Sequence, residues 1–168
     1  MAKKVLTELE QRKAKEILDD PVKWAQVFLT IFDNAKKEYT PWTARWYQVE
    51  MLRDKSTKKV ARCGRRTGKT ETMCVEMLHK AHTKPHHRIL VITPYENQVR
   101  LIFTRLNEMI ADSPLIKKEI KKNTKNPYWI ELNNGAIILG FTTGASSGSG
   151  GASIRGQRGD SLYLDEVD

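Results

Sequence analysis

Cysteine is scarce in this sequence: the 168 residues include only Cys63 and Cys74. Small domains held together by disulfides carry several cysteines at paired spacings, so a disulfide scaffold is excluded and a reducing compartment is expected. Long apolar runs are also missing, because none approaches the ~18 residues of a membrane-spanning helix. The N-terminal stretch MAKKVLTELEQRKAKEILDD lacks the apolar centre of a signal peptide. We therefore expect a soluble protein of the intracellular type.

Acidic residues are in the minority. The chain has 20 Asp and Glu against 29 Lys and Arg, for a formal net charge of +9. An excess of positive charge favours polyanionic partners such as nucleic acid or nucleotides. The charge is spread along the chain, however, and a solvated surface explains most of it. The length is that of roughly one domain, enough to bury a core.

The N-terminal third has the pattern of helices. Val5–Leu18 places apolar residues at mostly helical spacing among charges, which predicts an exposed amphipathic helix. The stretch DDPVKWAQVFLTIFD restarts a helix, with Asp20 as N-cap and proline at the first helical position. TPWTARWYQVEMLRD repeats this arrangement, with Thr40 or Thr43 as the cap. We predict a helical segment over residues 1–54.

The pattern then changes to alternating strands and helices. KKVARC (58–63) predicts a short strand, a helix follows from Lys69 to about His82, and HRILVIT (87–93) is typical of a strand buried on both faces. PYENQVRLIFTRLNEMIAD is the next helix, YWIEL and AIILGFTT flank the hairpin signal NNG, and SLYLDE is a last buried strand. Residues 55–168 are thus predicted to form an α/β core, a mainly parallel sheet flanked by helices.

The stretch ARCGRRTGKT departs by one place from the usual phosphate-loop spacing G-x-x-x-x-G-K-[ST]. Cys63 stands where glycine is expected, and Gly64 follows it. The end of the stretch still supplies what a triphosphate needs. Gly68 lets the backbone approach the phosphates, Lys69 reaches the β and γ oxygens, and Thr70 offers a hydroxyl to Mg²⁺. A GKT triplet also occurs by chance, but its position between a predicted strand and a predicted helix favours a P-loop NTPase.

A second acidic motif supports this interpretation. SLYLDEVD is an apolar strand that ends in paired carboxylates, of which Asp165 would hold the Mg²⁺ shell and Glu166 would polarise the attacking water. Such a pair is sometimes an ordinary strand end. Following a lysine-threonine loop in the same predicted sheet, it favours a metal and base pair. No N-K-x-D stretch is present to select guanine, so the predicted cofactors are ATP and Mg²⁺.

Four segments in this order resemble the large terminase subunit of tailed bacteriophages: ARWYQ, GRRTGKT, VITPYENQVRLIFTRL and SIRGQRGDSLYLDE. The similarity extends from about Pro41 to Asp168. That family's protein is an ATP-driven motor with a helicase-like (ASCE) P-loop domain, and it packages DNA into procapsids. The resemblance implies ATP hydrolysis and a location in the host cell cytoplasm. It also implies a homo-oligomer that works with double-stranded DNA, the terminase small subunit and the portal protein, and without a membrane.

The resemblance also implies roles for single residues. Gln48 resembles the glutamine that reads the adenine edge, although a solvent-facing glutamine on an aromatic helix gives the same pattern. Arg65 matches a loop arginine near the γ-phosphate. Arg155 matches an arginine inserted into a neighbouring subunit's site, although a solvated loop arginine is the alternative. The predicted nucleotide-binding residues are Gly64, Arg66, Thr67, Gly68, Lys69, Thr70 and Gln48; the catalytic residues are Glu166, Lys69, Arg65 and Arg155; the metal ligands are Thr70 and Asp165.

The sequence departs from the family at its C-terminal end. Terminase large subunits continue beyond the acidic pair with more sheet and a nuclease domain, whereas this sequence stops two residues after Glu166. We expect an incomplete sheet and no nuclease here, in a fragment, a split gene product or a segment interrupted by an insertion. Two alternatives stay open: another helicase-like DNA-dependent ATPase, and a non-catalytic nucleotide- or DNA-binding fragment.

Two further clusters have ordinary explanations. Four histidines resemble a metal site, but Pro85 breaks the helical register between the two pairs, so metal binding is not predicted. A run of lysines between Lys117 and Lys125 either contacts DNA phosphates or belongs to a solvated helix end. The histidines are His79, His82, His86 and His87.

Overall fold

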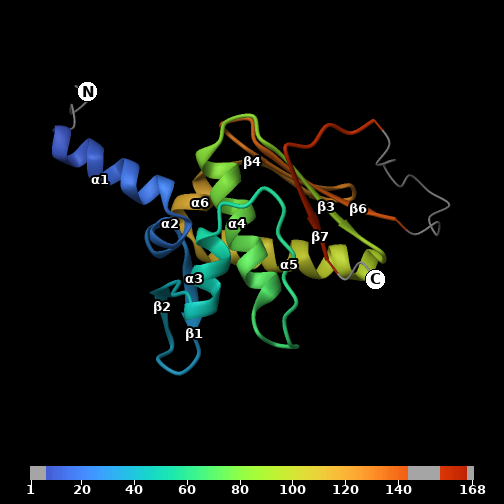
Figure 1. Cartoon of the computed structure of the whole chain (residues 1–168), viewed down its shortest axis with the longest axis horizontal. Coiled ribbons are helices and arrows are strands. Elements are labelled where there is room, and N and C mark those ends of the chain that lie inside the picture. Colours follow the sequence, from blue (N-terminus) through green and yellow to red (C-terminus); the bar gives the residue numbers. More distant parts are fainter. Residues whose placement is uncertain (1–6, 144–155, 166–168) are drawn as a thin grey trace.

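The computed structural model describes residues 7–143 and 156–165. In these residues, helices α4 and α5 lie along one side of a five-stranded sheet (Figure 1), and a small hairpin contacts α2 and α5. The helices are α1 (Glu8–Asp19), α2 (Pro21–Phe28), α3 (Trp46–Arg53), α4 (Lys69–Thr83), α5 (Glu96–Asp112) and α6 (Pro114–Lys118). The strands are β1 (Thr30–Asp33), β2 (Glu38–Pro41), β3 (Arg88–Thr93), β4 (Ile120–Lys125), β5 (Tyr128–Leu132), β6 (Ile137–Thr142) and β7 (Ser161–Leu164).

The first two helices begin at the caps that local chemistry favours. Thr7 caps α1 through a capping box with Glu10, and the helix buries no residue. Asp20 caps α2, accepting a hydrogen bond from the backbone N–H of Val22 at 2.9 Å, with Pro21 as the first helical residue. The predicted amphipathic helix and the predicted cap at Asp20 are therefore confirmed for the described residues.

The prediction that residues 1–54 are helical throughout is wrong. α2 ends at Phe28, and β1 and β2 then pair antiparallel. The side chain of Asp33 accepts hydrogen bonds from the backbone N–H groups of Ala35 and Lys36, which stabilises the turn between the strands. The first three residues of β1 are β-branched or aromatic, so their β propensity prevails over the helical spacing. α3 consequently begins at Trp46, and neither predicted threonine caps it.

The larger sheet has the strand order β4-β5-β6-β3-β7. β6, β3 and β7 are parallel, whereas β4, β5 and β6 are antiparallel. The α/β class and the predicted hairpin are confirmed, with a mixed sheet in place of a mainly parallel one. The difference arises from β4, whose lysines conceal the strand pattern. Lys121 and Lys122 lie in this strand, so the basic run is not only a helix end.

The predicted strand over residues 58–63 does not form. β7 lies at the edge of the sheet, and no strand among the described residues pairs with it except β3. Val60 is 99% exposed, because the segment has no backbone partner against which to bury it. Lys59 still anchors the segment, since its Nζ donates to the carbonyl of Met51 and to Glu76 Oε1 at 3.2 and 3.1 Å.

The main core lies between the sheet and the helices. It includes Ile89 and Val91 of β3 together with Leu78 of α4 and Leu106 of α5. α5 packs directly on β6 at Gly140, where an added Cβ would meet Val99 Cγ1 at 2.6 Å. Leu90, Ile92, Leu139 and Phe141 form a second cluster, which alternates with the main core along β3 and β6.

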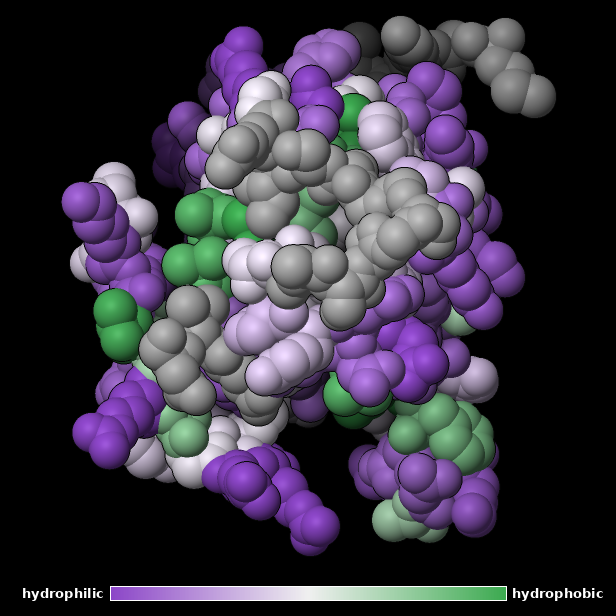
Figure 2. Space-filling view, turned by 90° about the vertical axis from the view of Figure 1, so that its right-hand side faces the viewer, coloured by the Kyte–Doolittle hydropathy of each residue, from purple (hydrophilic) through white to green (hydrophobic). Residues whose placement is uncertain are grey.

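The outer surface is mostly hydrophilic. Figure 2 shows charged and polar side chains over most of the view, with small apolar patches between them. Leu162 and Leu164 of the edge strand β7 contribute exposed apolar surface, at 56% and 53%. None of the helices in the described ranges is long and apolar enough to cross a membrane.

Candidate active site

The loop before α4 ends in a left-handed turn. Gly68 occupies the N-cap position of α4 with φ +82°, a conformation that glycine adopts without strain. Thr67 Oγ1 donates to the carbonyl of Gly64 at 3.0 Å, and Thr72 Oγ1 donates to the carbonyl of Gly68 at 3.0 Å. The loop therefore presents the first N–H groups of α4, which carry a partial positive charge, at its open end.

The two motifs predicted from separate parts of the sequence meet in space. Lys69, the first residue of α4, places Nζ 2.7 Å from Asp165 Oδ1. Asp165 follows β7, and its backbone N–H donates to the carbonyl of Ile92 in β3 at 3.3 Å. The parallel pairing of β7 with β3 thus carries the carboxylate to the start of α4. Thr70 lies beside Lys69 in the first turn of the same helix.

Gln48 of α3 contacts the loop directly. Its side chain is 4% exposed, and its Oε1 accepts a hydrogen bond from the backbone N–H of Arg45 at 2.9 Å. Its Nε2 donates to Thr72 Oγ1 at 3.0 Å and approaches the carbonyl of Gly68 at 3.5 Å. Gln48 is therefore not solvent-facing: its Oε1 caps the start of α3, and its Nε2 contacts the loop and the first turn of α4. Adenine reading by this residue stays a prediction.

Tyr47 is a loop contact that sequence reasoning missed. Its hydroxyl donates to the carbonyl of Thr67 at 2.6 Å and accepts from Arg45 Nη1 at 2.9 Å. The neighbouring Trp46 is 74% exposed, with its ring centroid 5.5 Å from that of Tyr47. The sequence offered one signal for this contact, the position of Tyr47 next to Gln48, because successive residues at the start of a helix can contact the same neighbouring segment.

Glu71 is a second residue that the motifs did not indicate. Its Oε1 accepts hydrogen bonds from Trp42 Nε1 at 2.8 Å and from Arg105 Nη2 at 3.0 Å. Arg105 Nη1 also donates to Glu108 Oε2 at 3.0 Å. Burial alone would lower the pKa of Arg105, but its hydrogen bonds with Glu108 and Glu71 and the attraction of both carboxylates raise it. A fully charged guanidinium thus links α5 to the first turn of α4.

The other predicted site residues are exposed on the loop or lie outside the described residues. Arg65 and Arg66 are exposed on the loop, and Arg66 has a positive φ of 60°. Arg155 and Glu166 lie outside the described residues. The structure therefore brings together the loop from Gly64 to Thr70 with Gln48 and Asp165.

The histidines take part in packing contacts. Trp24 Nε1 donates to His82 Nδ1 at 2.9 Å, and His79 Nε2 donates to the carbonyl of Leu18 at 2.8 Å. His87 Nε2 lies 2.8 Å from Ser161 Oγ. Within residues 7–143 and 156–165, no group of three or more His, Cys, Asp or Glu side chains is arranged to hold a metal ion.

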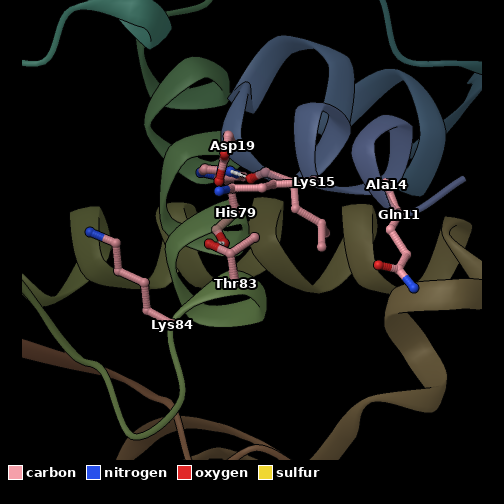
Figure 3. Close-up of a pocket in the computed structure, with 8 residues that line it drawn as sticks. Gln11, Ala14, Lys15, Asp19, His79, Thr83 and Lys84 are labelled. Carbon is pink, nitrogen blue, oxygen red and sulfur yellow. Dashed lines mark hydrogen bonds between the residues drawn. The ribbon is translucent and has the colours of Figure 1, made fainter. Parts of the chain in front are cut away.

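A cavity lies between α1 and α4, away from the loop (Figure 3). Its volume is about 620 Å³, and Lys15 and Asp19 of α1 face His79 and Thr83 of α4 across it. None of the predicted nucleotide-binding residues lines it. The cavity is thus separate from the candidate active site.

A family model described as "Terminase large subunit, T4likevirus-type, N-terminal" matches residues 60–168, well over half of the chain. The chain belongs to the terminase large-subunit family. The match includes the loop before α4, α4, the five-stranded sheet and Asp165, so the family resemblance is confirmed; three of the four segments lie within it, and ARWYQ precedes it.

Solved terminase structures share the fold. The crystal structure of the HK97 bacteriophage large terminase is similar with a TM-score of 0.65 at 11% identity, over 79% of this chain and 29% of that chain. The Thermus phage P74-26 large terminase ATPase domain is similar with a TM-score of 0.50 at 18% identity, over 59% of this chain and 45% of that chain. No curated protein matches the sequence. The terminase chain thus spans less than half the length of these structural relatives.

Proposed function

We propose that this chain is the ATPase motor portion of a phage terminase large subunit, which couples ATP hydrolysis to packaging of viral double-stranded DNA into the procapsid. The observation that carries the proposal is the 2.7 Å contact between Lys69 Nζ and Asp165 Oδ1 at the N-terminus of α4. In this arrangement a cation and a carboxylate stand beside backbone N–H groups that favour anions, as phosphoryl transfer requires.

The residues fit a magnesium nucleotide. Thr70 and Asp165 supply the hydroxyl and carboxylate oxygens that Mg²⁺ prefers, and the carboxylate of Asp165 already lies against a cationic group. Lys69 and the N–H groups after Gly68 would hold the phosphates, with Gly64, Arg66 and Thr67 shaping the loop. The bound metal would neutralise phosphate charge. We assign Gln48 to the adenine-binding side of the site, where its side chain also contacts the loop.

The assignments of Glu166, Arg65 and Arg155 rest on sequence. Glu166 would orient the attacking water, and Arg65 would contact the γ-phosphate region. Arg155 would act on a neighbouring subunit, so that hydrolysis depends on assembly into a homo-oligomer. We assign double-stranded DNA, the terminase small subunit and the portal protein as partners, in the host cell cytoplasm.

The proposal is tested in the full-length protein by measuring ATP binding and hydrolysis separately. Lys69→Ala should weaken ATP binding by about tenfold or more, because a charge-assisted contact to phosphate is lost. Glu166→Gln should abolish turnover and leave ATP binding nearly unchanged. Lys58→Ala, which removes an exposed lysine from the same segment, is the matched control.

The outcomes separate the proposal from its alternatives. Unchanged turnover in Glu166→Gln would contradict the assigned mechanism. ATP binding without turnover in the wild-type protein would instead favour a non-catalytic nucleotide-binding role. Hydrolysis stimulated by double-stranded DNA in the absence of procapsids would not distinguish a packaging motor from another DNA-dependent ATPase, so procapsid-dependent DNA uptake is the deciding measurement.

A further inference from the structure

A carboxylate lies unexpectedly close to the predicted phosphate site. Glu71 is in the first turn of α4, where a negative charge suits the helix dipole. Its Oε2 lies 3.8 Å from the position that a Cβ on Gly68 would occupy. The same N–H groups that favour Glu71 are those expected to receive phosphates. An uncompensated charge here would repel a triphosphate.

Two residues outside the loop hold this carboxylate in place. Trp42, which is 1% exposed, and Arg105 of α5 both donate to Glu71 Oε1. The side chains of Glu71 and Arg105 are only 28% and 32% exposed, so the attraction between them is less screened than that of a surface pair. The guanidinium therefore compensates the carboxylate within a partly desolvated contact.

We propose that Arg105 is a positioning residue that keeps the phosphate loop competent for triphosphates by neutralising Glu71 and holding it toward α5. Arg105 does not touch the nucleotide and acts through Glu71. The inference rests on the proposed function, since it presumes that the loop binds ATP. It adds a link between the loop and α5 that neither the loop motif nor the acidic motif contains.

A structural tie between α4 and α5 would use the same contacts, so the test must separate charge from packing. Arg105→Gln keeps an amide donor and much of the side-chain length but removes the charge. Arg105→Lys keeps the charge. Glu71→Gln still accepts a hydrogen bond from Trp42 and carries no charge. Arg100→Gln makes the same substitution at an exposed position of the same helix and serves as the control.

The measurement is the ATP dissociation constant of each variant of the full-length protein at low salt, with circular dichroism to check folding. Arg105→Gln should bind ATP about tenfold more weakly, because the Glu71 charge is left facing the phosphates. The double variant Glu71→Gln/Arg105→Gln should recover to within about twofold of wild type, and Arg105→Lys to within about threefold. Arg100→Gln should bind as wild type. High salt should reduce the defect of Arg105→Gln.

Results that differ from these expectations each contradict one specific statement. Wild-type affinity in Arg105→Gln, or a double variant as weak as the single variant, would overturn the inference while leaving the proposed function intact. A wild-type protein that binds no ATP would overturn the proposed function and this inference with it. If Arg105→Gln does not fold, Arg105→Lys decides, because loss of binding in that charged variant contradicts a charge-based role.

Discussion

The loop before α4 depends on a single glycine for two separate reasons. The backbone of Gly68 has φ +82°, where any side chain is strained. The space beside it is also occupied, because an added Cβ would stand 2.9 Å from Gln48 Nε2. The conformation of the loop and its contact with α3 therefore both require glycine at position 68. A larger residue would disturb both at once.

The residue-scale prediction concerns Gly68→Ala. The variant should lower the free energy of unfolding by about 1–2 kcal/mol, from the left-handed backbone alone, with a further loss from displacement of Gln48. Chemical denaturation of the variant and wild type measures this. Gly156→Ala is the matched control, since Gly156 has φ +84° with open space around it. Equal losses in the two variants would show that the Gln48 contact contributes nothing.

The sequence motifs predicted Lys69 and Asp165 but not the residues that hold the loop and α4 in place. Lys69 and Asp165 were identified because glycine-rich loops and acidic strand ends have fixed local spacings, and the parallel sheet then joins them. Tyr47, Glu71 and Arg105 have no such spacing. Their contacts depend on how α3 and α5 pack against α4, and a single sequence contains no periodic signal for pairs so far apart.

At the scale of elements, three rings join α2 to α4. Trp24 Nε1 donates to His82 Nδ1, so this nitrogen must be unprotonated. Phe28 stacks on Trp24 and also contacts His82, with ring centroids 5.6 and 4.8 Å apart. Burial lowers the pKa of His82 below its ordinary 6.5, against a smaller opposing effect of Glu119. The junction, the contact of Trp24 and Phe28 of α2 with His82 of α4, therefore requires a neutral imidazole.

This junction should make stability depend on pH. A histidine whose pKa is lowered by folding contributes fully above about pH 6.5, and the contribution falls as pH drops toward the lowered pKa, because the unfolded chain takes up the proton first. The free energy of unfolding should therefore decrease as the pH falls from about 6.5 toward the lowered pKa. Denaturation across this range measures it.

Substitutions identify the groups responsible. His82→Gln should reduce the slope of stability against pH, and His79 and His87, whose pKa values burial also lowers, account for the remainder. His86→Asn changes an exposed histidine that takes no part in the junction, and it should keep the wild-type slope. A His82→Gln variant with the full wild-type slope would contradict this assignment.

The elements that sequence predicted well are those with strong internal patterns. β3 is an apolar run, and α4 and α5 have long helical periodicities, so all three were placed within a few residues. β4 was missed because its lysines resemble a helix end, and β1 because Ile31 and Phe32 continue a helical spacing. Residues 58–63 show the opposite error, because a strand was predicted there and none forms. A strand needs a neighbouring strand to pair with, and the sequence pattern alone does not show whether one is present.

At the scale of the molecule, one core spans the expected division at residue 54. Trp24, Leu29 and Trp42 from the N-terminal segment belong to the same buried cluster as Leu78 of α4 and Ile89 of β3. The backbone N–H of Trp42 also donates to the carbonyl of Leu29 at 3.0 Å, which joins the hairpin to α2. The N-terminal segment therefore contributes to the stability of the α/β core.

We accordingly predict cooperative unfolding. Trp24→Ala should lower the free energy of unfolding of the whole chain by about 3–5 kcal/mol, since it removes a fully buried aromatic side chain. Circular dichroism of the helices and fluorescence of the remaining tryptophans should report the same midpoint. Two separate transitions, with only the first shifted by the substitution, would indicate independent N-terminal and core units.

The contact between Lys69 and Asp165 has a thermodynamic consequence. Each side chain satisfies the other's charge, so neither is released to a ligand without leaving its partner uncompensated. In the proposed site, phosphate bound by Lys69 would leave Asp165 ready for a cation, and a cation on Asp165 would leave Lys69 ready for phosphate. The two affinities would then be linked with positive, reciprocal cooperativity. We therefore expect the ion pair to favour the metal-nucleotide complex over either component alone.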